Sequence, residues 1–264
     1  MPTTSSPPIA LTIAGSDSGG GAGIQADLKT FHARGVHGLS AITAITSQNT
    51  RGVGAVHAVP LTHLRSQLAA VFDDFPIGAV KTGMLGSAAA TRLVAREMAA
   101  RQPSWLVVDP VMIATSGARL LDEDAVEALI GKLIPLADIL TPNLPEAEAL
   151  LGHPIRTDAQ CDAAGAALRA LGAGAVLLKG GHGHADGSEV VDRYYDARGV
   201  MELRHPRLPL EGHGTGCTLA AAIAAELAQG RSPRAAVRRA VAYVHRVLLH
   251  GYRPGAGSAH VLRH

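Results

Sequence analysis

Two glycine-rich turns in this sequence could hold an anion with their backbone N–H groups. The first, residues 15–23, has five glycines among nine residues and opens a predicted helix. Its spacing matches neither a dinucleotide fingerprint nor a P-loop, so it either contacts a small polar ligand or is a flexible loop that packs tightly. The second, Gly214-Thr215-Gly216, starts a long alanine-rich helix that Gly230 closes. A helix start offers unpaired N–H groups and the positive end of the dipole, so we expect phosphate groups at the second turn.

Cys217 lies in the first turn of that predicted helix. A helix N-terminus favours the thiolate relative to the usual thiol pKa of roughly 8.5. A thiolate beside a phosphate site could take the proton from a substrate hydroxyl. Free cysteines are also among the most buried residues, where they act as small apolar groups. The residue type and position therefore leave a general base and a buried packing residue equally open.

Acidic side chains directly follow two of the predicted strands. Asp109 ends the segment VVD, and Glu146 comes three residues after Asn143 in TPNLPEAEAL. Carboxylates at such positions could share Mg²⁺ with the oxygens of a phosphate group. Glu146 could instead only stabilise the first turn of its own helix.

Two further polar side chains follow predicted strands. Lys179 ends the segment AVLLK, from which a point charge could reach a phosphate. Gln48 follows LSAITAITS, and its amide can donate and accept side by side, as the edge of an aminopyrimidine or purine requires. An ordinary loop amide would look the same in the sequence.

The elements that would position these residues alternate between strands and helices. Strand-length apolar segments occupy residues 9–15, 39–47, 77–83, 105–110, 137–143 and 174–181. They are nearly continuous in hydrophobicity, which is typical of strands buried on both faces. The helices between them are predicted to be capped by Thr62, by Asp122 and by Ser232, with Pro233 as the first helical residue of the last one.

This alternation predicts an α/β fold whose mostly parallel sheet is covered by helices on both faces. Residues 188–205 read as two strands around a short turn, which predicts a hairpin near one edge of the sheet. We expect a single domain over residues 1–264, with residues 1–8 disordered. In such open sheets, ligands bind beyond the carboxyl ends of the strands, where the polar residues above are found.

The composition excludes several classes of protein. The formal net charge of the 264 residues is +2 and aromatic residues make up 3%, which favours neither nucleic-acid nor anionic-membrane binding. No stretch reaches the roughly 18 apolar residues of a membrane span. With only Cys161 and Cys217 there is no disulfide framework, and His182-Gly183-His184 lacks the partners of a zinc site. We expect a soluble protein of a reducing compartment.

Seven motifs together resemble the hydroxymethylpyrimidine/phosphomethylpyrimidine kinases of thiamine biosynthesis, within the ribokinase-like superfamily. In that family's order they read AGSDSGGGAGIQADLKTF, ITAITSQNT, KTGMLG, VVDPVM, TPNLPEAEAL, LLKGGH and HGTGCTLAAAIA. The resemblance implies an ATP- and Mg²⁺-dependent cytoplasmic homodimer that phosphorylates 4-amino-5-hydroxymethyl-2-methylpyrimidine and then its monophosphate. A pyridoxal kinase and a non-catalytic nucleotide- or vitamer-binding protein are the alternatives.

The resemblance also implies a role for each candidate residue. Gln48 would read the aminopyrimidine, in a pocket that is formed by Gly15, Asp27, Met84 and Val111. Asp109 and Glu146 would organise Mg²⁺, and Cys217 would be the base. The nucleotide phosphates would be bound by Lys179, Asn143, Gly214, Thr215 and Gly216. Thr115 departs from the family pattern, because many relatives have a lysine there.

Overall fold

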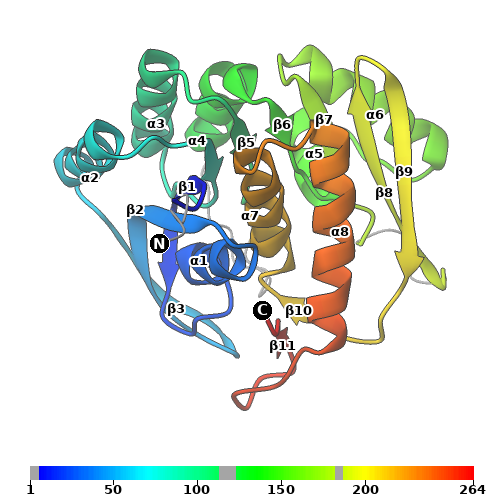
Figure 1. Ribbon diagram of the computed structural model, residues 1–264. Helices are drawn as coiled ribbons and strands as arrows, with labels where there is room; N and C mark the ends of the chain where they lie inside the picture. Colours follow the sequence, from blue (N-terminus) through cyan, green and yellow to red (C-terminus); the bar gives the residue numbers. More distant parts are fainter. Residues whose placement is uncertain (1–5, 113–122, 182–186) are drawn as a thin grey trace, which may run out of the picture.

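A nine-stranded sheet runs through the computed structural model, which describes residues 6–112, 123–181 and 187–264 (Figure 1). The strand order is β3-β2-β1-β4-β5-β6-β7-β8-β9. Its strands are β1 (Ile9–Asp17), β2 (His37–Asn49), β3 (Gly52–Ala58), β4 (Ala79–Thr82), β5 (Leu106–Val108), β6 (Ile139–Leu140), β7 (Ala175–Leu178), β8 (Glu189–Asp196) and β9 (Gly199–Pro206). The six central strands, β2, β1, β4, β5, β6 and β7, are parallel to one another. Strand β3 at one edge and strands β8 and β9 at the other pair antiparallel. The predicted edge hairpin is therefore confirmed.

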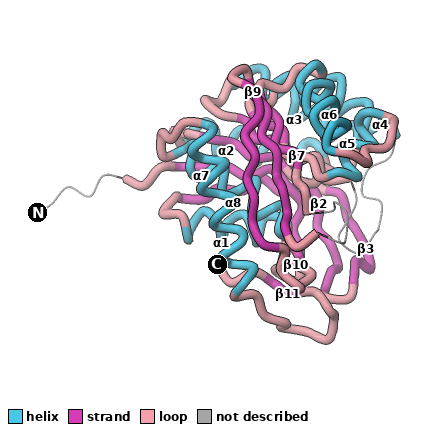
Figure 2. The backbone as a smooth tube through the Cα atoms, turned by 90° about the vertical axis from the view of Figure 1, so that its right-hand side faces the viewer, coloured by secondary structure: helices cyan, strands magenta, loops and turns pink. Residues whose placement is uncertain are grey.

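Helices cover both faces of the sheet. One face carries α1 (Gly23–Ala33), α7 (Thr215–Ala228) and α8 (Pro233–Leu249). The other carries α2 (Leu61–Asp74), α3 (Ala88–Arg101), α4 (Glu123–Ala128), α5 (Leu144–Leu151) and α6 (Asp158–Ala170). A π-helical turn, Leu129–Leu133, and a 3₁₀ turn, Ile134–Leu136, follow α4. Figure 2 shows α7 and α8 on the opposite side of β8 and β9 from α4, α5 and α6. The predicted fold class is confirmed.

Two apolar cores form because successive strand residues point to opposite faces of the sheet. Leu11 of β1 and Val108 of β5 pack into the core beneath α2 to α6. Their neighbours Ala10 and Val107 pack into the core beneath α1, α7 and α8. The central strands are thus buried on both faces and mostly apolar, as the sequence pattern predicted.

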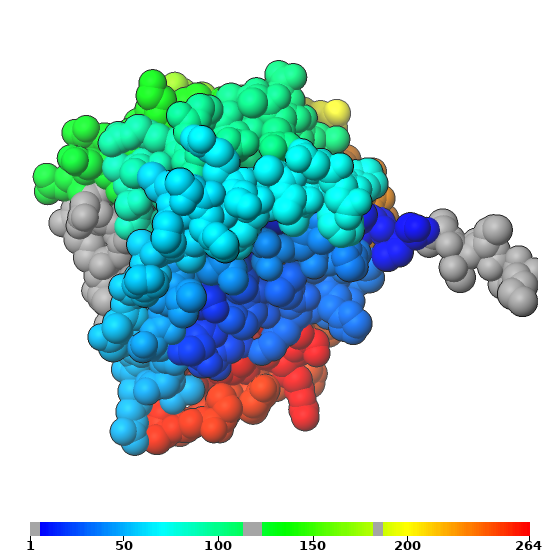
Figure 3. Space-filling model, turned by 90° about the vertical axis from the view of Figure 1, so that its left-hand side faces the viewer, coloured from blue at the N-terminus to red at the C-terminus, as the bar shows by residue number. Residues whose placement is uncertain are grey.

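The C-terminal segment packs against the β2–β3 turn. Strand β10 (Gly212–His213) pairs in parallel with β11 (His260–Val261), which brings the last residues back to the start of α7. Close by, the Gly257 N–H donates a hydrogen bond of 3.1 Å to Thr50 Oγ1. Figure 3 shows this contact zone, with the red C-terminal segment along the lower edge of the blue N-terminal one.

The helix starts differ from the sequence prediction at one place. Helix α2 begins at Leu61 with Pro60 as its N-cap residue, so the prediction that Thr62 caps it is wrong. Thr62 already lies inside the first turn, where its side chain cannot reach an N–H group ahead of it. Asp122, the predicted cap of α4, lies outside the described residues.

The last predicted helix start is confirmed in position. Ser232 is the N-cap residue of α8 and Pro233 is its first residue, although the Ser232 side chain makes no capping hydrogen bond. Strand β3 was not predicted, because its seven residues are exposed or half-buried and give no apolar run. Of the eight residues predicted to be disordered, 1–5 lie outside the described residues, whereas Pro8 accepts a 2.8 Å hydrogen bond from the His37 N–H.

Candidate active site

The candidate site lies where the strand order reverses. The chain leaves β1 for β2 on one side and returns to β4 on the other, which opens a crevice beyond the carboxyl ends of these strands. There the Gly15 N–H donates a hydrogen bond of 3.1 Å to the carbonyl of Met84. A Cβ atom at position 15 would lie 2.4 Å from Cε of Met84, so the methionine side chain occupies the space that glycine leaves free. Two residues of the predicted pyrimidine pocket are therefore in contact.

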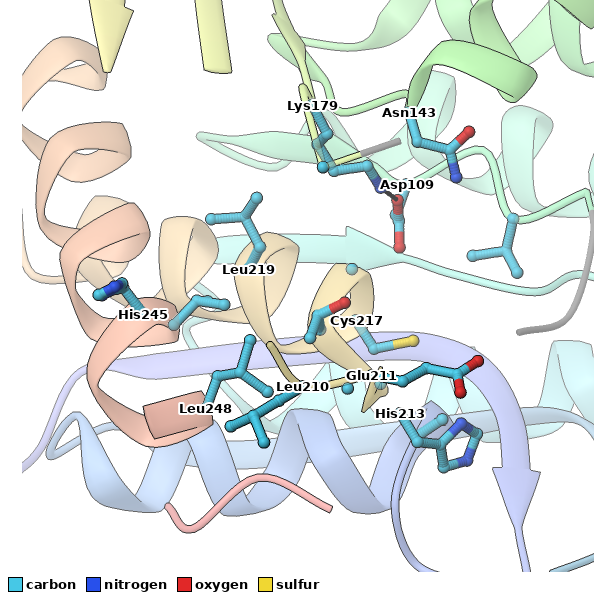
Figure 4. Close-up of a pocket in the computed structure, with 18 of the residues that line it drawn as sticks. Asp109, Asn143, Lys179, Leu210, Glu211, His213, Cys217, Leu219, His245 and Leu248 are labelled. Atoms are coloured by element: carbon cyan, nitrogen blue, oxygen red, sulfur yellow. Dashed lines mark hydrogen bonds and ion pairs between the residues drawn. The ribbon is translucent and has the colours of Figure 1, made fainter. Parts of the chain in front are cut away.

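A cavity of about 920 Å³ occupies this crevice, a volume within the usual range for small-molecule sites. It brings together nearly all of the residues singled out from the sequence. The predicted residues in its wall are Gly15, Gln48, Met84, Asp109, Val111, Asn143, Glu146, Lys179, Gly214, Thr215, Gly216 and Cys217. Figure 4 shows Lys179, Asp109 and Asn143 at one end, His213 at the other and Cys217 between them. Thr115 and His182-Gly183-His184 lie outside the described residues.

Asp27 is the exception, because it does not line the cavity and is fully buried below it. Its Oδ2 atom accepts hydrogen bonds from Lys81 Nζ at 2.8 Å and from Thr12 Oγ1 at 2.6 Å. Burial raises the pKa of Asp27 against the opposing charge of Lys81. In this structure Asp27 is thus half of a buried ion pair below the cavity wall, and its place in a pyrimidine pocket stays a prediction.

Lys81 is a residue to which the sequence assigned no role. It stands in the buried strand β4, and its side chain is 0% exposed. Burial alone would lower its pKa, but the neighbouring carboxylate of Asp27, together with that of Asp109, raises the pKa above the usual value. The available signal was a lysine inside an apolar strand of a chain with only four lysines.

The turn before α7 faces the charged end of the cavity. Gly214 has φ +81°, and a Cβ there would collide with the carbonyl oxygen of Gly21, so glycine is required on both counts. A Cβ built on Gly216 would lie 3.2 Å from Lys179 Nζ and 3.7 Å from Asp109 Oδ2. The N-terminus of α7 and the strand-end charges therefore face the same space.

Cys217 lines the cavity and is half-buried, but its acidity differs from the sequence prediction. Burial raises the pKa of its thiol to about 11, although the Lys81 ammonium and a backbone hydrogen bond with Gly23 act in the opposite direction. The prediction that the helix start favours the thiolate is wrong for the substrate-free protein. Loss of hydration outweighs the helix dipole here.

Two carboxylates surround the ammonium of Lys179. Its Nζ donates to Asp109 Oδ1 at 3.0 Å and lies 3.7 Å from Glu146 Oε2. Burial alone would lower the pKa of Lys179, yet the neighbouring Asp109 and Glu146 raise it. Thr141 Oγ1 also donates to Asp109 Oδ1 at 3.1 Å, which fixes this carboxylate at the end of β5.

Glu146 and Asn143 form a reciprocal cap at the start of α5. The Asn143 side chain accepts from the Glu146 N–H, and Glu146 Oε2 accepts from the Asn143 N–H, both at 2.8 Å. Glu146 therefore has the helix-stabilising role that the sequence left open, while it also lines the cavity beside Lys179. The Asn143 amide group keeps its N–H donors free of this cap.

The end of the cavity around Gln48 contains a network that the sequence did not predict. His213 Nε2 lies 3.1 Å from Asp17 Oδ2 and 3.1 Å from the side-chain amide of Gln48. Asp17 also accepts hydrogen bonds from the backbone N–H groups of Gly19, Gly21 and Ala22. Burial opposes ionisation of Asp17, but its hydrogen bonds with His213 and these N–H groups hold its pKa below the usual value.

The remaining wall of the cavity is mostly apolar. It is formed by the segment after β9 together with α7 and α8, and includes Leu208, Leu210, Leu219, Val244 and Leu248. Figure 4 shows Leu210, Leu219 and Leu248 on the side of Cys217 away from Asn143. This wall can take a flat aromatic ring next to the anion-binding turn.

Comparison with known proteins identifies the family. Residues 17–262 match the family model described as phosphomethylpyrimidine kinase. The chain belongs to this family. It is 49% identical over 251 residues to the hydroxymethylpyrimidine/phosphomethylpyrimidine kinase of Haemophilus influenzae, over 94% of this chain and 93% of that protein. The predicted family resemblance is therefore confirmed.

Solved structures agree with this assignment. The crystal structure of phosphomethylpyrimidine kinase from Clostridium difficile 630 has a TM-score of 0.81 and 44% identity, over 90% of this chain and 98% of that chain. The pyridoxal kinase from Staphylococcus aureus in complex with AMP-PCP and pyridoxal has a TM-score of 0.89 and 33% identity, over 98% and 93%. The predicted ribokinase-like fold and kinase class are confirmed. Within residues 6–112, 123–181 and 187–264, no helix is both long and apolar enough to cross a membrane.

Proposed function

We propose that this protein is an ATP-dependent kinase that phosphorylates 4-amino-5-hydroxymethyl-2-methylpyrimidine and then the resulting monophosphate. The observation that carries the proposal is one cavity whose wall joins a group of polar residues around Gln48 to the glycine-containing turn at the start of α7, in which Cys217 lies. Phosphoryl transfer needs mainly positioning and charge stabilisation, which such an arrangement supplies. The relatives named for this activity support the substrate assignment.

The pyrimidine is proposed to bind at the end of the cavity formed by Gly15, Gln48, Met84 and Val111. Gln48 can donate to and accept from the polar edge of the ring, while Met84 and Val111 contact its apolar surface. The hydroxymethyl group then points toward Cys217. The network of Asp17 and His213 joins this group of binding residues, as the next subsection develops.

The triphosphate of ATP is proposed to lie along the start of α7. The N–H groups of the turn from Gly214 to Cys217 face the phosphates, and Lys179 supplies a positive charge beside them. Asn143 can donate from its side-chain amide, since its oxygen is engaged by the cap of α5. The apolar wall near Leu219 and Leu248 is left for the adenine ring.

Asp109 and Glu146 are proposed to hold Mg²⁺ together with phosphate oxygens. Among the described residues no group of three acidic, histidine or cysteine side chains could enclose a metal alone. Two carboxylates at one edge of the cavity nevertheless fit Mg²⁺, which commonly takes one or two protein carboxylates plus substrate phosphates. The bound ion would neutralise charge on the phosphates. Asp109 and Glu146 already balance the positive charge of Lys179 at this place.

Cys217 is proposed to accept the proton of the substrate hydroxyl. Its thiol lies at the start of α7 and lines the same cavity as Gln48 and Lys179. Burial raises the pKa of this thiol to about 11, so the thiol first gives its own proton to solvent and the resulting thiolate then accepts the proton of the substrate hydroxyl. Binding of phosphates and their metal changes the charges around the thiol and therefore its pKa. The pH dependence of kcat measures that pKa in the substrate complex.

A pyridoxal kinase is the second candidate, because pyridoxal kinases of known structure match 98% of this chain. Turnover with Mg-ATP should be measured in parallel on the pyrimidine alcohol, its monophosphate and pyridoxal. We expect the two pyrimidine substrates to have the highest kcat/KM. A higher kcat/KM for pyridoxal would replace the proposed substrate, and ATP binding without any turnover would favour the non-catalytic alternative.

Three further expectations join this proposal. We propose that residues 1–264 form a single domain, since every strand from β1 to β9 pairs in one sheet. The homodimer and the cytoplasmic location are predictions from the family resemblance. Gel filtration with light scattering tests the homodimer, and a measured mass of one 27.1 kDa chain would contradict it.

A further inference from the structure

One imidazole nitrogen meets two partners at the substrate end of the cavity. Nε2 of His213 lies 3.1 Å from Asp17 Oδ2 and 3.1 Å from Nε2 of the Gln48 amide. The His213 side chain is 14% exposed and that of Asp17 is 3% exposed, so water competes little for these contacts. A ring nitrogen carries either a proton or a lone pair, so Nε2 is either a donor toward both partners or an acceptor toward both.

The ionisation of Asp17 determines whether His213 Nε2 carries a proton. The two Asp17 oxygens accept the N–H groups of Gly19, Gly21 and Ala22, as an ionised carboxylate does. The same hydrogen bonds and the contact with His213 keep its pKa below the usual value despite burial. An ionised carboxylate only accepts hydrogen bonds, so His213 Nε2 must carry a proton and donate it toward Asp17.

The protonated nitrogen in turn fixes the amide of Gln48. A donor at His213 Nε2 requires the amide oxygen on its side, because the amide nitrogen would also present hydrogens. In this structure the amide nitrogen faces His213 and the amide oxygen lies 3.3 Å from Thr46 Oγ1, so the requirement is met when the amide group is turned by 180°. The hydroxyl hydrogen of Thr46 is donated to the Ser16 carbonyl at 2.9 Å, so Oγ1 is free to accept from an NH₂ group. Every member of the chain is satisfied when the Gln48 oxygen faces His213 and its nitrogen faces Thr46.

We propose that His213, held by Asp17, is a specificity-determining positioning residue that fixes the orientation of the Gln48 amide. The inference rests on the proposed function, in which this amide meets the amino edge of the pyrimidine. A 4-aminopyrimidine offers a donor at its amino group and an acceptor at the adjacent ring nitrogen. Its 4-oxo analogue offers the reverse order, an acceptor at C4 and an N–H donor beside it. An amide held in one orientation favours one of these orders, whereas a freely turning amide accommodates both.

The Asp17–His213 contact also joins the two turns around the site. A Cβ at Gly21 would collide with the His213 ring, and a Cβ at Gly214 would collide with the Gly21 carbonyl. The glycine-rich turn after β1 and the turn before α7 are therefore packed directly on each other. A substitution of His213 could therefore also disturb the turn before α7. The KM for ATP of the same variants separates this disturbance from the loss of the His213 hydrogen bond.

The test compares three variants with the parent enzyme under saturating Mg-ATP. His213→Leu removes the donor, whereas His213→Gln places an amide N–H near the former Nε2 position. His63→Leu makes the same chemical change at an exposed histidine of α2, outside the cavity. For each protein, kcat/KM is measured on the 4-amino alcohol and on its 4-oxo analogue, together with the KM for ATP and the melting temperature.

We expect His213→Leu to lower the amino-over-oxo preference by roughly 5- to 150-fold, the range set by one buried hydrogen bond. His213→Gln should restore most of that preference, and His63→Leu should keep it at the parental value. An equal fall of kcat/KM on both analogues in His213→Leu, with their ratio unchanged, would overturn the inference and leave His213 a purely structural residue. If the parent enzyme does not phosphorylate the pyrimidine alcohol at all, the proposed function fails, which is a separate outcome.

Discussion

Two lysines stand among carboxylates at the same edge of the sheet, but water reaches only one of them. The Lys81 side chain, in β4, is 0% exposed and donates to Asp27 Oδ2 at 2.8 Å. The Lys179 side chain, just after β7, is 13% exposed, lines the cavity and donates to Asp109 at 3.0 Å. The first pair is closed within the protein, whereas the second opens onto the cavity.

This difference separates a structural ion pair from a chemical one. A pair removed from water keeps its partner, because either charge alone would be costly in the protein interior. A pair that lines a cavity can exchange its partner for the phosphate of an incoming substrate. Cys217 is coupled to both, because the positive charges of Lys81 and Lys179 each interact with its thiol. Changes to these three residues test the comparison directly.

The largest effect is expected at the thiol that both lysines influence. Cys217→Ala keeps the backbone N–H of the α7 turn and nearly the same packing, but removes the ionisable group. The loss of a general base lowers the rate by roughly 10²–10⁴-fold, so kcat should fall by that factor while the KM for ATP stays close to parental. Steady-state kinetics with the pyrimidine alcohol measures both.

A matched control exists for this substitution. Cys161→Ala changes the other cysteine, which is buried in α6, and should leave kcat unchanged. If Cys217→Ala retained a kcat within a few-fold of the parent and lost only stability, the thiol would be a packing residue. The transfer would then depend on positioning alone.

The closed pair should affect stability more than the open pair does. Lys81→Met leaves the Asp27 carboxylate buried without its cation, which costs about 3–5 kcal/mol of unfolding free energy. Urea denaturation followed by circular dichroism measures this loss. The double variant Lys81→Met/Asp27→Leu removes both charges and should recover most of the stability. A single variant as stable as the parent would show that the Lys81–Asp27 pair is not the closed structural pair described above.

The open pair should show the opposite pattern. In Lys179→Met, Asp109 and Glu146 still border the cavity, so the unfolding free energy should change less than in Lys81→Met. The lost positive charge should instead lower kcat by roughly 10²–10³-fold, as the loss of one preorganised charge in a catalytic site does. Parental kcat together with a large loss of stability would erase the distinction between the two lysines.

The sequence predicted the central sheet well, for a physical reason. Strands such as β1 and β7 are buried on both faces and therefore read as unbroken apolar segments. The polar residues that follow them were identified as site residues because the carboxyl ends of parallel strands meet at one edge. The edge strand β3 was missed, since an exposed strand leaves no comparable pattern.

The parts that the sequence missed depend on contacts between distant residues. Asp17 and His213 are 196 positions apart, and no local pattern links them. Burial of the Asp27–Lys81 pair is likewise decided by the packing of several elements around it. The acidity of Cys217 was predicted in the wrong direction because the sequence shows a helix start but not the loss of hydration.

The smallest predicted effect concerns the acidity of that thiol in the substrate-free protein. Burial raises its pKa to about 11, while the Lys81 charge lowers it. The unfolded chain loses the thiol proton near pH 8.5, a proton that the native state retains, so this thiol makes stability fall as pH rises from about 8.5 to about 11. The iodoacetamide alkylation rate of Cys217, followed by mass spectrometry, should rise about tenfold per pH unit over that range. The Lys81→Met/Asp27→Leu variant removes both charges, so its alkylation rate shows how much the Lys81–Asp27 pair contributes to the pKa of Cys217. An alkylation midpoint below pH 8.5 would instead show that the helix start and the two lysines together outweigh burial, and that the thiol is ionised before any substrate binds.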